Sequence, residues 1–239
     1  MTITKTHKFS LKAASLDTFD ALLFHTPYCK LVQKSLARLA LNDYVGLSSE
    51  EKAAQAPELE RFNEVVLEES YFDRDLEKAM IGHSSAKFAR LTKPSLLVAT
   101  NVGNMYTPSL YGGLISYLVS APADTLAGHH VGLFSYGSGL ASSFFSLRVT
   151  ADPLKLSSLL TSCLADVKTR LEDRRKMSPA DFVSTLAVRE KAVHAAPYSP
   201  VGATDTMFAG TWYLESIDEK HRRQYSRVPV APPHKNGHA

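Results

Sequence analysis

The sequence predicts an α/β protein, because short apolar segments typical of buried strands alternate with longer segments of helical periodicity. The apolar run 20–24 ends in a polar loop at His25, and the run 95–100 ends in a polar loop at Asn101. A third run, 131–135, leads into a glycine-containing loop. Ligands of layered α/β folds tend to gather where strands end. The polar residues of these loops are therefore the first candidates for a functional site.

The first half of the chain is expected to be one strand followed by a mainly helical region. The run 20–24 stops before Pro27, and the apolar residues beyond this proline have helical spacing, which predicts a helix over about 28–45. Residues 47–92 carry an excess of acidic over basic side chains and are expected to form helices and loops with a solvated face.

The second half is expected to contain the other two strands, three helices and a hairpin. Thr107 followed by Pro108 predicts a helix N-cap with proline in the first turn, and the helix should reach about residue 119. In chain order, the remaining expectations are a strand continuing at 141–149, helices of about 20 and 15 residues after Asp152-Pro153 and Ser178-Pro179, and a hairpin of 210–214 with 222–228.

Composition points to a folded protein and excludes several classes. The 239 residues are 44% hydrophobic and 21% charged, close to the globular average. A net charge of +3 is too small and too scattered to predict a nucleic-acid partner. No run is apolar enough for a membrane helix. Two cysteines can form neither a disulfide scaffold nor a four-ligand zinc site, so no metal is expected.

Three residues at the predicted strand ends carry groups suited to carbonyl chemistry. His25 can present a ring nitrogen to a carbonyl or a proton. Asn104 can donate its amide to a developing oxyanion. Ser138 lies between two glycines that let a ligand approach the backbone closely. Each residue also has a structural interpretation: a histidine bonded to backbone, an asparagine turn and a glycine bulge.

The helix after His25 carries a stripe of cations. Lys30, Lys34 and Arg38 are four residues apart, so they share one helix face, which suits a phosphate-bearing ligand or is an ordinary solvated face. Cys29 lies near the helix start, where a thiol pKa can be lowered and the thiol can act as a nucleophile. Cys163 is expected to be a small packed residue inside a helix.

Five strings of sequence carry a resemblance to a known family: FHTPYCKLVQKSLAR at 24–38, GNMYT at 103–107, FSYGSGLA at 134–141, GTWYL at 210–214 and DEKHRR at 218–223. In this order they resemble the C-terminal half of eukaryotic hydroxymethylglutaryl-CoA synthases, which belong to the thiolase-like superfamily. The resemblance divides the chain into a variable N-terminal segment (1–15), the synthase C-terminal domain (16–229) and a flexible tail (230–239).

The resemblance implies the C-terminal half of a thiolase-like fold with layers in the order αβαβα, and a homodimer. It implies an acyltransferase that condenses acetyl-CoA with acetoacetyl-CoA to give 3-hydroxy-3-methylglutaryl-CoA and CoA, for isoprenoid and sterol biosynthesis by the mevalonate pathway. No cofactor is expected beyond these substrates. Production of ketone bodies is the alternative role. The absence of a convincing transit peptide favours a cytoplasmic location.

Roles follow by matching motif to motif. His25 is similar to the family histidine that engages the acetoacetyl carbonyl and transfers a proton. Lys30 and Lys34 resemble lysines beside bound CoA, Asn104 resembles an asparagine of the acyl pocket, and Ser138 resembles a serine that contacts substrate.

One departure from the family limits the expected activity. The family's nucleophilic cysteine and general-base glutamate belong to its N-terminal half, and neither motif occurs here. Cys29 matches a non-nucleophilic position, so no nucleophile is assigned. The chain is therefore expected to be part of a synthase that is inactive alone. The alternatives are a non-catalytic acyl-CoA-binding or dimerisation module that pairs with a full-length or N-terminal-half subunit, and a split enzyme whose other half is a separate chain.

Overall fold

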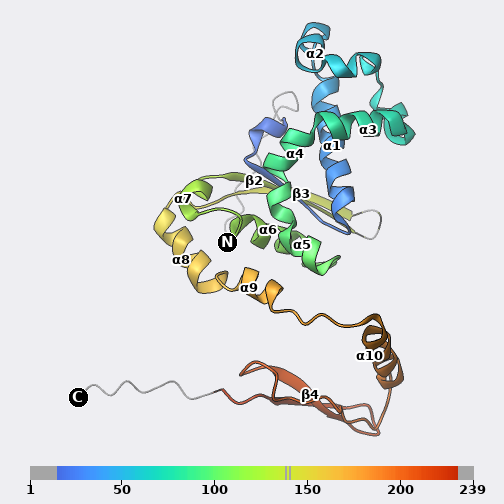
Figure 1. Ribbon diagram of the computed structural model, residues 1–239, viewed down its shortest axis with the longest axis vertical. Helices are drawn as coiled ribbons and strands as arrows, with labels where there is room; N and C mark the ends of the chain where they lie inside the picture. The colour runs from blue at the N-terminus through green and yellow to red at the C-terminus, as the bar shows by residue number, and fades with distance from the viewer. Residues whose placement is uncertain (1–14, 138, 140, 231–239) are drawn as a thin grey trace, which may run out of the picture. The chain divides into compact units, whose positions relative to one another are not determined.

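The computed structural model describes residues 15–137, 139 and 141–230. The chain divides into two compact units, Met1–Arg174 and Arg175–Ala239, which are treated separately (Figure 1). The segments 1–14 and 231–239, which make up nearly all of the predicted variable N-terminal segment and the predicted tail, lie outside the described residues. The domain boundaries expected from the family resemblance stay a prediction.

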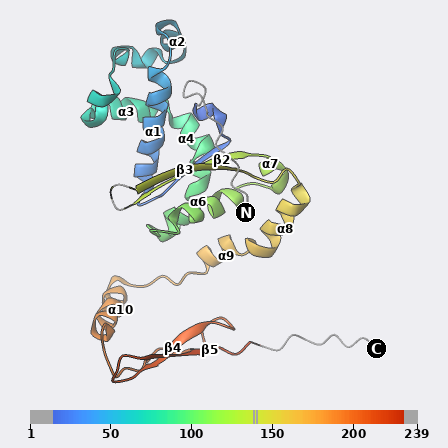
Figure 2. The ribbon, with the colours of Figure 1, turned by 180° about the vertical axis from the view of Figure 1, so that it is seen from behind.

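A three-stranded sheet forms the centre of the first unit. Its strands are β1 (Ala21–Phe24), β2 (His130–Gly137) and β3 (Ala141–Arg148), in the order β1-β2-β3. β1 pairs with β2 in parallel, with Phe24 opposite Phe134, and β2 pairs with β3 in antiparallel orientation. Figures 1 and 2 show helices on both sides of this sheet, with α1 (Cys29–Val45) on one side and α6 (Ser109–Leu118) on the other.

Each face of the sheet has its own hydrophobic core. Leu22 and Phe24 pack with α1, α3 (Arg74–His83) and α4 (Ser85–Leu91). Ala21 and Leu23 pack with α6, α7 (Ala123–Leu126) and α8 (Pro153–Cys163). Successive side chains of a strand point to opposite faces, so four consecutive apolar residues serve two cores. This explains why β1 is a continuous apolar run rather than an alternating one.

The other helical segments of the first unit are short. They are η1 (Leu16–Thr18), α2 (Ser49–Gln55), η2 (Pro57–Phe62), η3 (Leu67–Phe72), η4 (Lys93–Leu96), α5 (Leu97–Val102) and α9 (Val167–Glu172). The prediction of helices and loops over 47–92 is confirmed. The long helix predicted from about residue 28 is also confirmed, as α1.

The predicted strand at 95–100 is wrong, because this segment forms η4 and α5. An apolar run of six residues is compatible with either structure. Leu96 and Ala99 are both buried, and their separation of three residues places them on the same face of a helix. The N–H of Val98 donates to Ser116 Oγ of α6 at 3.0 Å, so packing against α6 decides the outcome.

Three helix starts are predicted from a capping residue followed by proline, and two of these predictions are confirmed. Asp152 and Ser178 cap their helices through side-chain oxygens, as predicted. The helix after Asp152 ends at Cys163 and is followed by α9, rather than continuing for about 20 residues. α6 begins at Ser109, so Thr107 is not its N-cap.

The second unit contains one helix and one hairpin. These are α10 (Pro179–Ala192), β4 (Trp212–Ile217) and β5 (Arg223–Arg227), and the predicted hairpin is confirmed by the antiparallel pairing of β4 with β5. The Arg227 guanidinium lies 5.7 Å from the centre of the Trp212 ring, across the hairpin. Among the helices of the described residues, none has the length and apolar character needed to cross a membrane.

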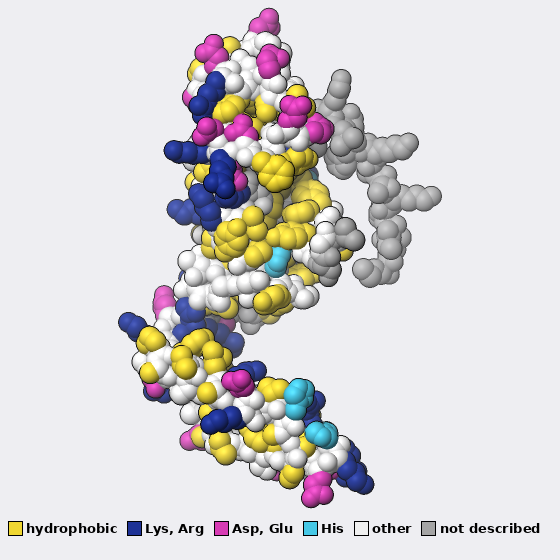
Figure 3. All heavy atoms as spheres, turned by 90° about the vertical axis from the view of Figure 1, so that its right-hand side faces the viewer, with side chains coloured by type: hydrophobic (Ala, Val, Ile, Leu, Met, Phe, Trp, Pro, Cys, Tyr) yellow, Lys and Arg dark blue, Asp and Glu magenta, His cyan; other side chains and the backbone are white. Residues whose placement is uncertain are grey.

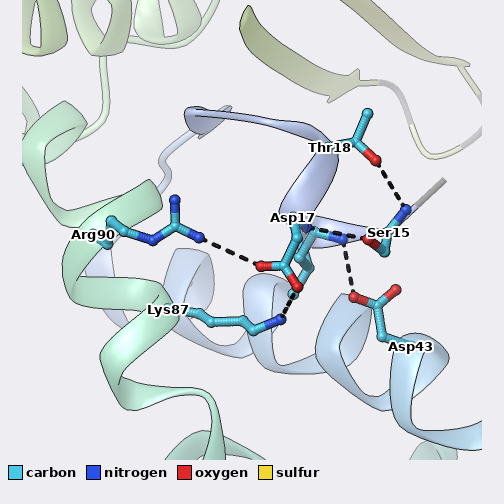
Figure 4. Close-up of polar contacts among 7 residues, drawn as sticks. Ser15, Asp17, Thr18, Asp43, Lys87 and Arg90 are labelled. Atoms are coloured by element: carbon cyan, nitrogen blue, oxygen red, sulfur yellow. Dashed lines mark hydrogen bonds and ion pairs between the residues drawn. The ribbon is translucent and has the colours of Figure 1, made fainter. Parts of the chain in front are cut away.

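The segment that leads into β1 is held by a polar network (Figure 4). The N–H of Leu16 donates to Asp43 Oδ2 of α1 at 2.9 Å. Asp17 forms ion pairs with Lys87 and Arg90 of α4, at 2.9 and 3.4 Å. Burial raises the pKa of Asp43 above its ordinary value of 3.8, so its hydrogen-bonding role carries a desolvation cost.

Shortening a buried side chain of the central strand, β2, tests how much the cores on the two faces of the sheet contribute to stability. Leu133 of β2 is fully buried, and Leu133→Ala should lower the free energy of unfolding by about 2–5 kcal/mol. Leu154 is 82% exposed, so Leu154→Ala is the matched control and should change stability by less than about 0.5 kcal/mol. Urea unfolding followed by circular dichroism measures both variants. Equal effects of the two substitutions would contradict this account of the core.

The raised pKa of Asp43 predicts a pH-dependent stability. The folded state binds the Asp43 proton more tightly than the unfolded state, so stability falls as pH rises from 3.8 through the folded pKa. Asp43→Asn keeps an oxygen for the Leu16 N–H and removes this penalty. The variant should be more stable than the parent at pH 7, with the difference shrinking toward pH 3.5. Urea midpoints at several pH values check this, with the exposed Asp205→Asn as control. A difference independent of pH would refute it.

Candidate active site

His25 directly follows β1 and faces the end of β2. Its backbone N–H donates to the carbonyl of Phe134 at 2.8 Å, which continues the parallel pairing by one residue. Its half-buried ring meets the Tyr136 ring edge-on, with centroids 5.4 Å apart. The histidine is therefore held at the carboxyl ends of the two parallel strands, where the sequence predicts ligand chemistry.

The loop after β1 is anchored to the start of α6. The N–H of Thr26 donates to Ser109 Oγ at 3.1 Å, and the Ser109 hydroxyl is 3.4 Å from the Thr26 carbonyl oxygen. Both side chains are buried. This contact joins residues 83 positions apart and fixes His25 against the loop that precedes α6.

A cleft of about 470 Å³ opens beside the His25 ring. It is lined by His25, Tyr106, Thr107, Ser135, Tyr136, Gly137, Ala141, Ser142 and Ser143. The lining is rich in hydroxyl groups and contains no carboxylate among the described residues. Such a site can orient a polar acyl group while the imidazole transfers a proton. Sequence reasoning missed Tyr106 and Tyr136, although both lie within the family-like strings.

Asn104 lies in the turn between α5 and α6 and not at a strand end. Its Oδ1 accepts a hydrogen bond from the N–H of Tyr106 at 2.8 Å, and Tyr106 has a positive φ of 57°. Gly103, with φ of 82°, supplies the backbone freedom that the turn needs. The Asn104 oxygen thus shapes the loop that brings Tyr106 to the cleft. The amide nitrogen is the group suited to the predicted oxyanion role.

Ser138 lies outside the described residues. Gly137 before it and Ala141 after it both line the His25 cleft.

The cationic stripe of α1 is divided among three different environments. Lys30 lines a second cleft, of about 750 Å³, and its Nζ donates to Gln33 Oε1 at 2.9 Å. Lys34 Nζ is 2.8 Å from a carboxylate oxygen of Glu77 on α3. Arg38 donates to Ser70 Oγ and to the carbonyl of Leu67. Equal spacing on one helix face therefore does not give the three cations equal access to a ligand.

The two cysteines lie outside the His25 cleft. Cys29 is half-buried, with its Sγ 3.5 Å from Thr100 Oγ1, and it lines the same cleft as Lys30. Cys163 is exposed, so the expectation that it is packed is wrong. The buried side chain of α8 is Leu156, and Cys163 lies at the end of that helix.

A further histidine is held away from the cleft. The Tyr117 hydroxyl is 2.6 Å from His129 Nδ1. Burial, with a smaller effect from the charge of Asp20, raises the pKa of Tyr117 to about 12, so the phenol is neutral at physiological pH.

No group of three or more His, Cys, Asp or Glu in the described part of the chain is arranged to hold a metal ion.

Comparisons with known proteins agree on one family. The model of the hydroxymethylglutaryl-coenzyme A synthase C-terminal family matches residues 2–228. Hydroxymethylglutaryl-CoA synthase 2 of Blattella germanica is 48% identical over 215 residues, 89% of this chain and 46% of the relative. The human cytoplasmic synthase is 48% identical over 221 residues (92% and 42%), and the mouse mitochondrial synthase is 49% identical over 218 (90% and 43%). This chain spans less than half the length of these relatives.

Solved structures agree on the fold. MvaS in complex with 3-hydroxy-3-methylglutaryl coenzyme A is similar with a TM-score of 0.61 and 27% identity, over 89% of this chain and 42% of that one. PksG, an HMG-CoA synthase from Bacillus subtilis, has a TM-score of 0.59 at 20% identity (90% and 45%), which bears on the fold alone. The α/β architecture is thus that of the C-terminal half of a thiolase-like synthase, and the chain belongs to the hydroxymethylglutaryl-coenzyme A synthase C-terminal family.

Proposed function

We propose that this chain acts as the C-terminal part of a hydroxymethylglutaryl-CoA synthase. In this reaction acetyl-CoA condenses with acetoacetyl-CoA, and hydrolysis by one water molecule then releases 3-hydroxy-3-methylglutaryl-CoA, so the products are this thioester and CoA. The observation that carries the proposal is the half-buried His25 in a hydroxyl-lined cleft at the ends of two parallel strands. The names of the relatives support the same activity.

In this proposal His25 assists the carbon–carbon bond-forming step. The carbanion of an enzyme-bound acetyl group attacks the ketone carbon of acetoacetyl-CoA. As the new bond forms, the electron pair of the C=O bond moves to oxygen, and the His25 imidazolium donates its proton to that oxygen. A histidine suits this role because its proton can be given and regained near neutral pH. The edge-on Tyr136 ring restricts the orientation of the imidazole.

The remaining catalytic groups are proposed to come from outside this chain. Covalent capture of the acetyl group needs an activated thiolate, and deprotonation of its methyl group needs a base. Cys29 is a poor candidate for the thiolate because it lines the Lys30 cleft rather than the His25 cleft. The nucleophilic cysteine and the glutamate base are therefore assigned to an N-terminal half of the synthase, and the chain alone is expected to be inactive.

The other proposed roles concern binding. Lys30 contacts the phosphates of CoA. Lys34 does so more weakly, because Glu77 already neutralises it. Asn104 and Ser138 contact the acyl groups. No cofactor is required besides the two thioester substrates. A cytoplasmic location and a role in isoprenoid and sterol supply are proposed, although both cytoplasmic and mitochondrial synthases are similar to this chain.

The alternative is a non-catalytic acyl-CoA-binding or dimerisation module that pairs with a full-length or N-terminal-half subunit. Exposed aromatic side chains favour a protein partner for both the synthase role and the non-catalytic module. Phe144 and Phe145 of β3 are 54% and 42% exposed. In the described residues, β3 pairs only with β2. A largely apolar groove of about 850 Å³ includes Phe144 and Tyr28. Figure 3 shows hydrophobic side chains gathered on one surface of the first unit.

Replacement of His25 distinguishes the catalytic proposal from the binding-module alternative. The full chain is mixed with an N-terminal-half polypeptide of a synthase. Condensation is followed by consumption of acetoacetyl-CoA, and acetylation by transfer of a labelled acetyl group from acetyl-CoA to protein. His25→Ala should lower the condensation rate by about 10²-fold or more while acetylation by acetyl-CoA is retained. His83→Ala, which removes a contact with Glu58 outside the His25 cleft, is the control and should leave the rate unchanged. Loss of the acetylation step in the His25 variant would contradict the assigned role.

Replacement of Phe144 tests the partner surface. Phe144→Ser should weaken association with the N-terminal-half polypeptide by about tenfold or more, because a large apolar contact is lost. CoA binding by the chain should not change. Leu154→Ser alters a more exposed apolar residue, on α8, and should leave association intact. Sedimentation velocity measures the complex, and unchanged association of the Phe144 variant would rule out this surface.

A further inference from the structure

Ser109, the first residue of α6, has an almost completely buried side chain, with 1% of its surface exposed. A buried hydroxyl group needs hydrogen-bond partners, because leaving it unpaired is costly. Ser116, a second buried serine of α6, donates its hydroxyl to the carbonyl of Gly112 in the same helix. The Ser109 hydroxyl instead bonds to the loop after β1. Its contacts therefore connect α6 with the segment that carries His25.

The Ser109 hydroxyl bonds to both backbone groups of Thr26, the residue after His25. Its oxygen accepts a hydrogen bond from the Thr26 N–H at 3.1 Å, and it donates to the Thr26 carbonyl at 3.4 Å. The Thr26 N–H lies in the same planar peptide unit as the His25 carbonyl. A bond to this N–H therefore fixes the orientation of the peptide unit that follows the His25 Cα.

The peptide unit that precedes the His25 Cα is fixed as well. Its N–H, from His25, donates to the carbonyl of Phe134 at 2.8 Å. Its carbonyl, from Phe24, accepts a hydrogen bond from the Thr26 hydroxyl at 2.9 Å. When both neighbouring peptide units are held, the two soft backbone dihedrals of His25 are set, and so is the direction of its side chain.

The backbone of Ser109 holds a second wall of the His25 cleft. The Ser109 N–H donates to the carbonyl of Tyr106 at 3.0 Å. Tyr106 and Thr107 line the cleft, whereas Ser109 itself does not. One residue behind the cleft is therefore bonded both to the wall that carries the histidine and to the wall that carries Tyr106.

We propose that Ser109 is a positioning residue for the reaction at His25. Its hydroxyl sets the position of the imidazole relative to an acyl group held beside the Tyr106 loop. The identity of the reaction rests on the proposed synthase function, whereas the positioning of His25 rests on the contacts alone. Proton transfer is sensitive to such positioning, because a general acid must lie within about 2.6–3.2 Å of the atom that it protonates.

The first test observes His25 in the full chain without a partner. Two-dimensional NMR of the chain with ¹³C-labelled histidine records the ring signals, and those of His25 are the ones absent from His25→Ala. Ser109→Ala should shift or broaden the His25 signals, because the ring then samples several orientations. Ser109→Thr keeps the hydroxyl and should leave them as in the parent. Identical His25 signals in the parent and Ser109→Ala would overturn the proposal.

The second test measures condensation by the chain mixed with an N-terminal-half polypeptide. Ser109→Ala should lower kcat by about ten- to a hundredfold, because a small displacement of a catalytic group is costly. The KM for acetoacetyl-CoA should change little, since no binding contact is removed. Ser109→Thr should keep most of the rate. An equal loss in Ser109→Ala and Ser109→Thr would show that packing matters rather than the hydroxyl, and would overturn the proposal.

Thr92, which follows α4, provides a matched control. Its fully buried hydroxyl donates to the carbonyl of Leu22 in β1 at 2.8 Å, and the residue does not line the His25 cleft. Thr92→Val removes this bond while it keeps the volume of the side chain. The variant should unfold at a lower urea concentration than the parent, as Ser109→Ala should, because each leaves a buried backbone group unpaired. The His25 signals and kcat should be unchanged in Thr92→Val. Equal losses of kcat in Thr92→Val and Ser109→Ala would contradict a specific role of Ser109.

Failure of this proposal is distinguishable from failure of the proposed function. If the parent mixture does not condense the two thioesters, but Ser109→Ala and not Thr92→Val disturbs the His25 signals, the synthase role is rejected and the positioning role is upheld. If the parent mixture condenses them and Ser109→Ala does so at the same rate, the synthase role is upheld and the positioning role is rejected.

Discussion

The parallel pairing of β1 with β2 is the constraint on which the first unit depends. It joins residues about 110 positions apart, as the hydrogen bond from His130 to Asp20 illustrates. Closing so long a loop costs conformational entropy, which the apolar residues of both strands offset by filling a core on each face of the sheet. The same pairing brings His25 to the end of β2. Stability and the candidate active site therefore have a common origin.

The segment 25–30 connects two sites of different character. At its start, His25 faces a small cleft lined by hydroxyl groups, which suits proton transfer to a carbonyl. At its end, Lys30 faces a larger cleft that combines apolar walls with unbalanced positive charge. Cys29 lies with Lys30, away from the histidine. The CoA thioesters of the proposed function have the same two-part chemistry, with a reactive acyl end and an anionic CoA end.

The exposed surfaces agree with a chain that matches less than half of its relatives' length. β3 has aromatic side chains open to solvent on both faces, and the groove beside α1 is largely apolar. Large apolar patches of this kind are typical of interaction surfaces. The proposed synthase function accounts for them, because the nucleophile and base it requires are assigned to a partner half that can cover such surfaces.

Local sequence signals determined the elements that depend on few neighbours: the long helix α1, the capped starts of α8 and α10, and the β4–β5 hairpin. Motif resemblance singled out His25 and Lys30. Tertiary contacts decided the rest. The 95–100 segment is helical because it packs against α6. Lys34, which the helix spacing predicts as a ligand-binding cation, forms an ion pair with Glu77 of α3 instead. Lys30, Lys93 and Lys168 line one cleft only after folding, because no spacing along the chain predicts that three separate elements lie around the same space.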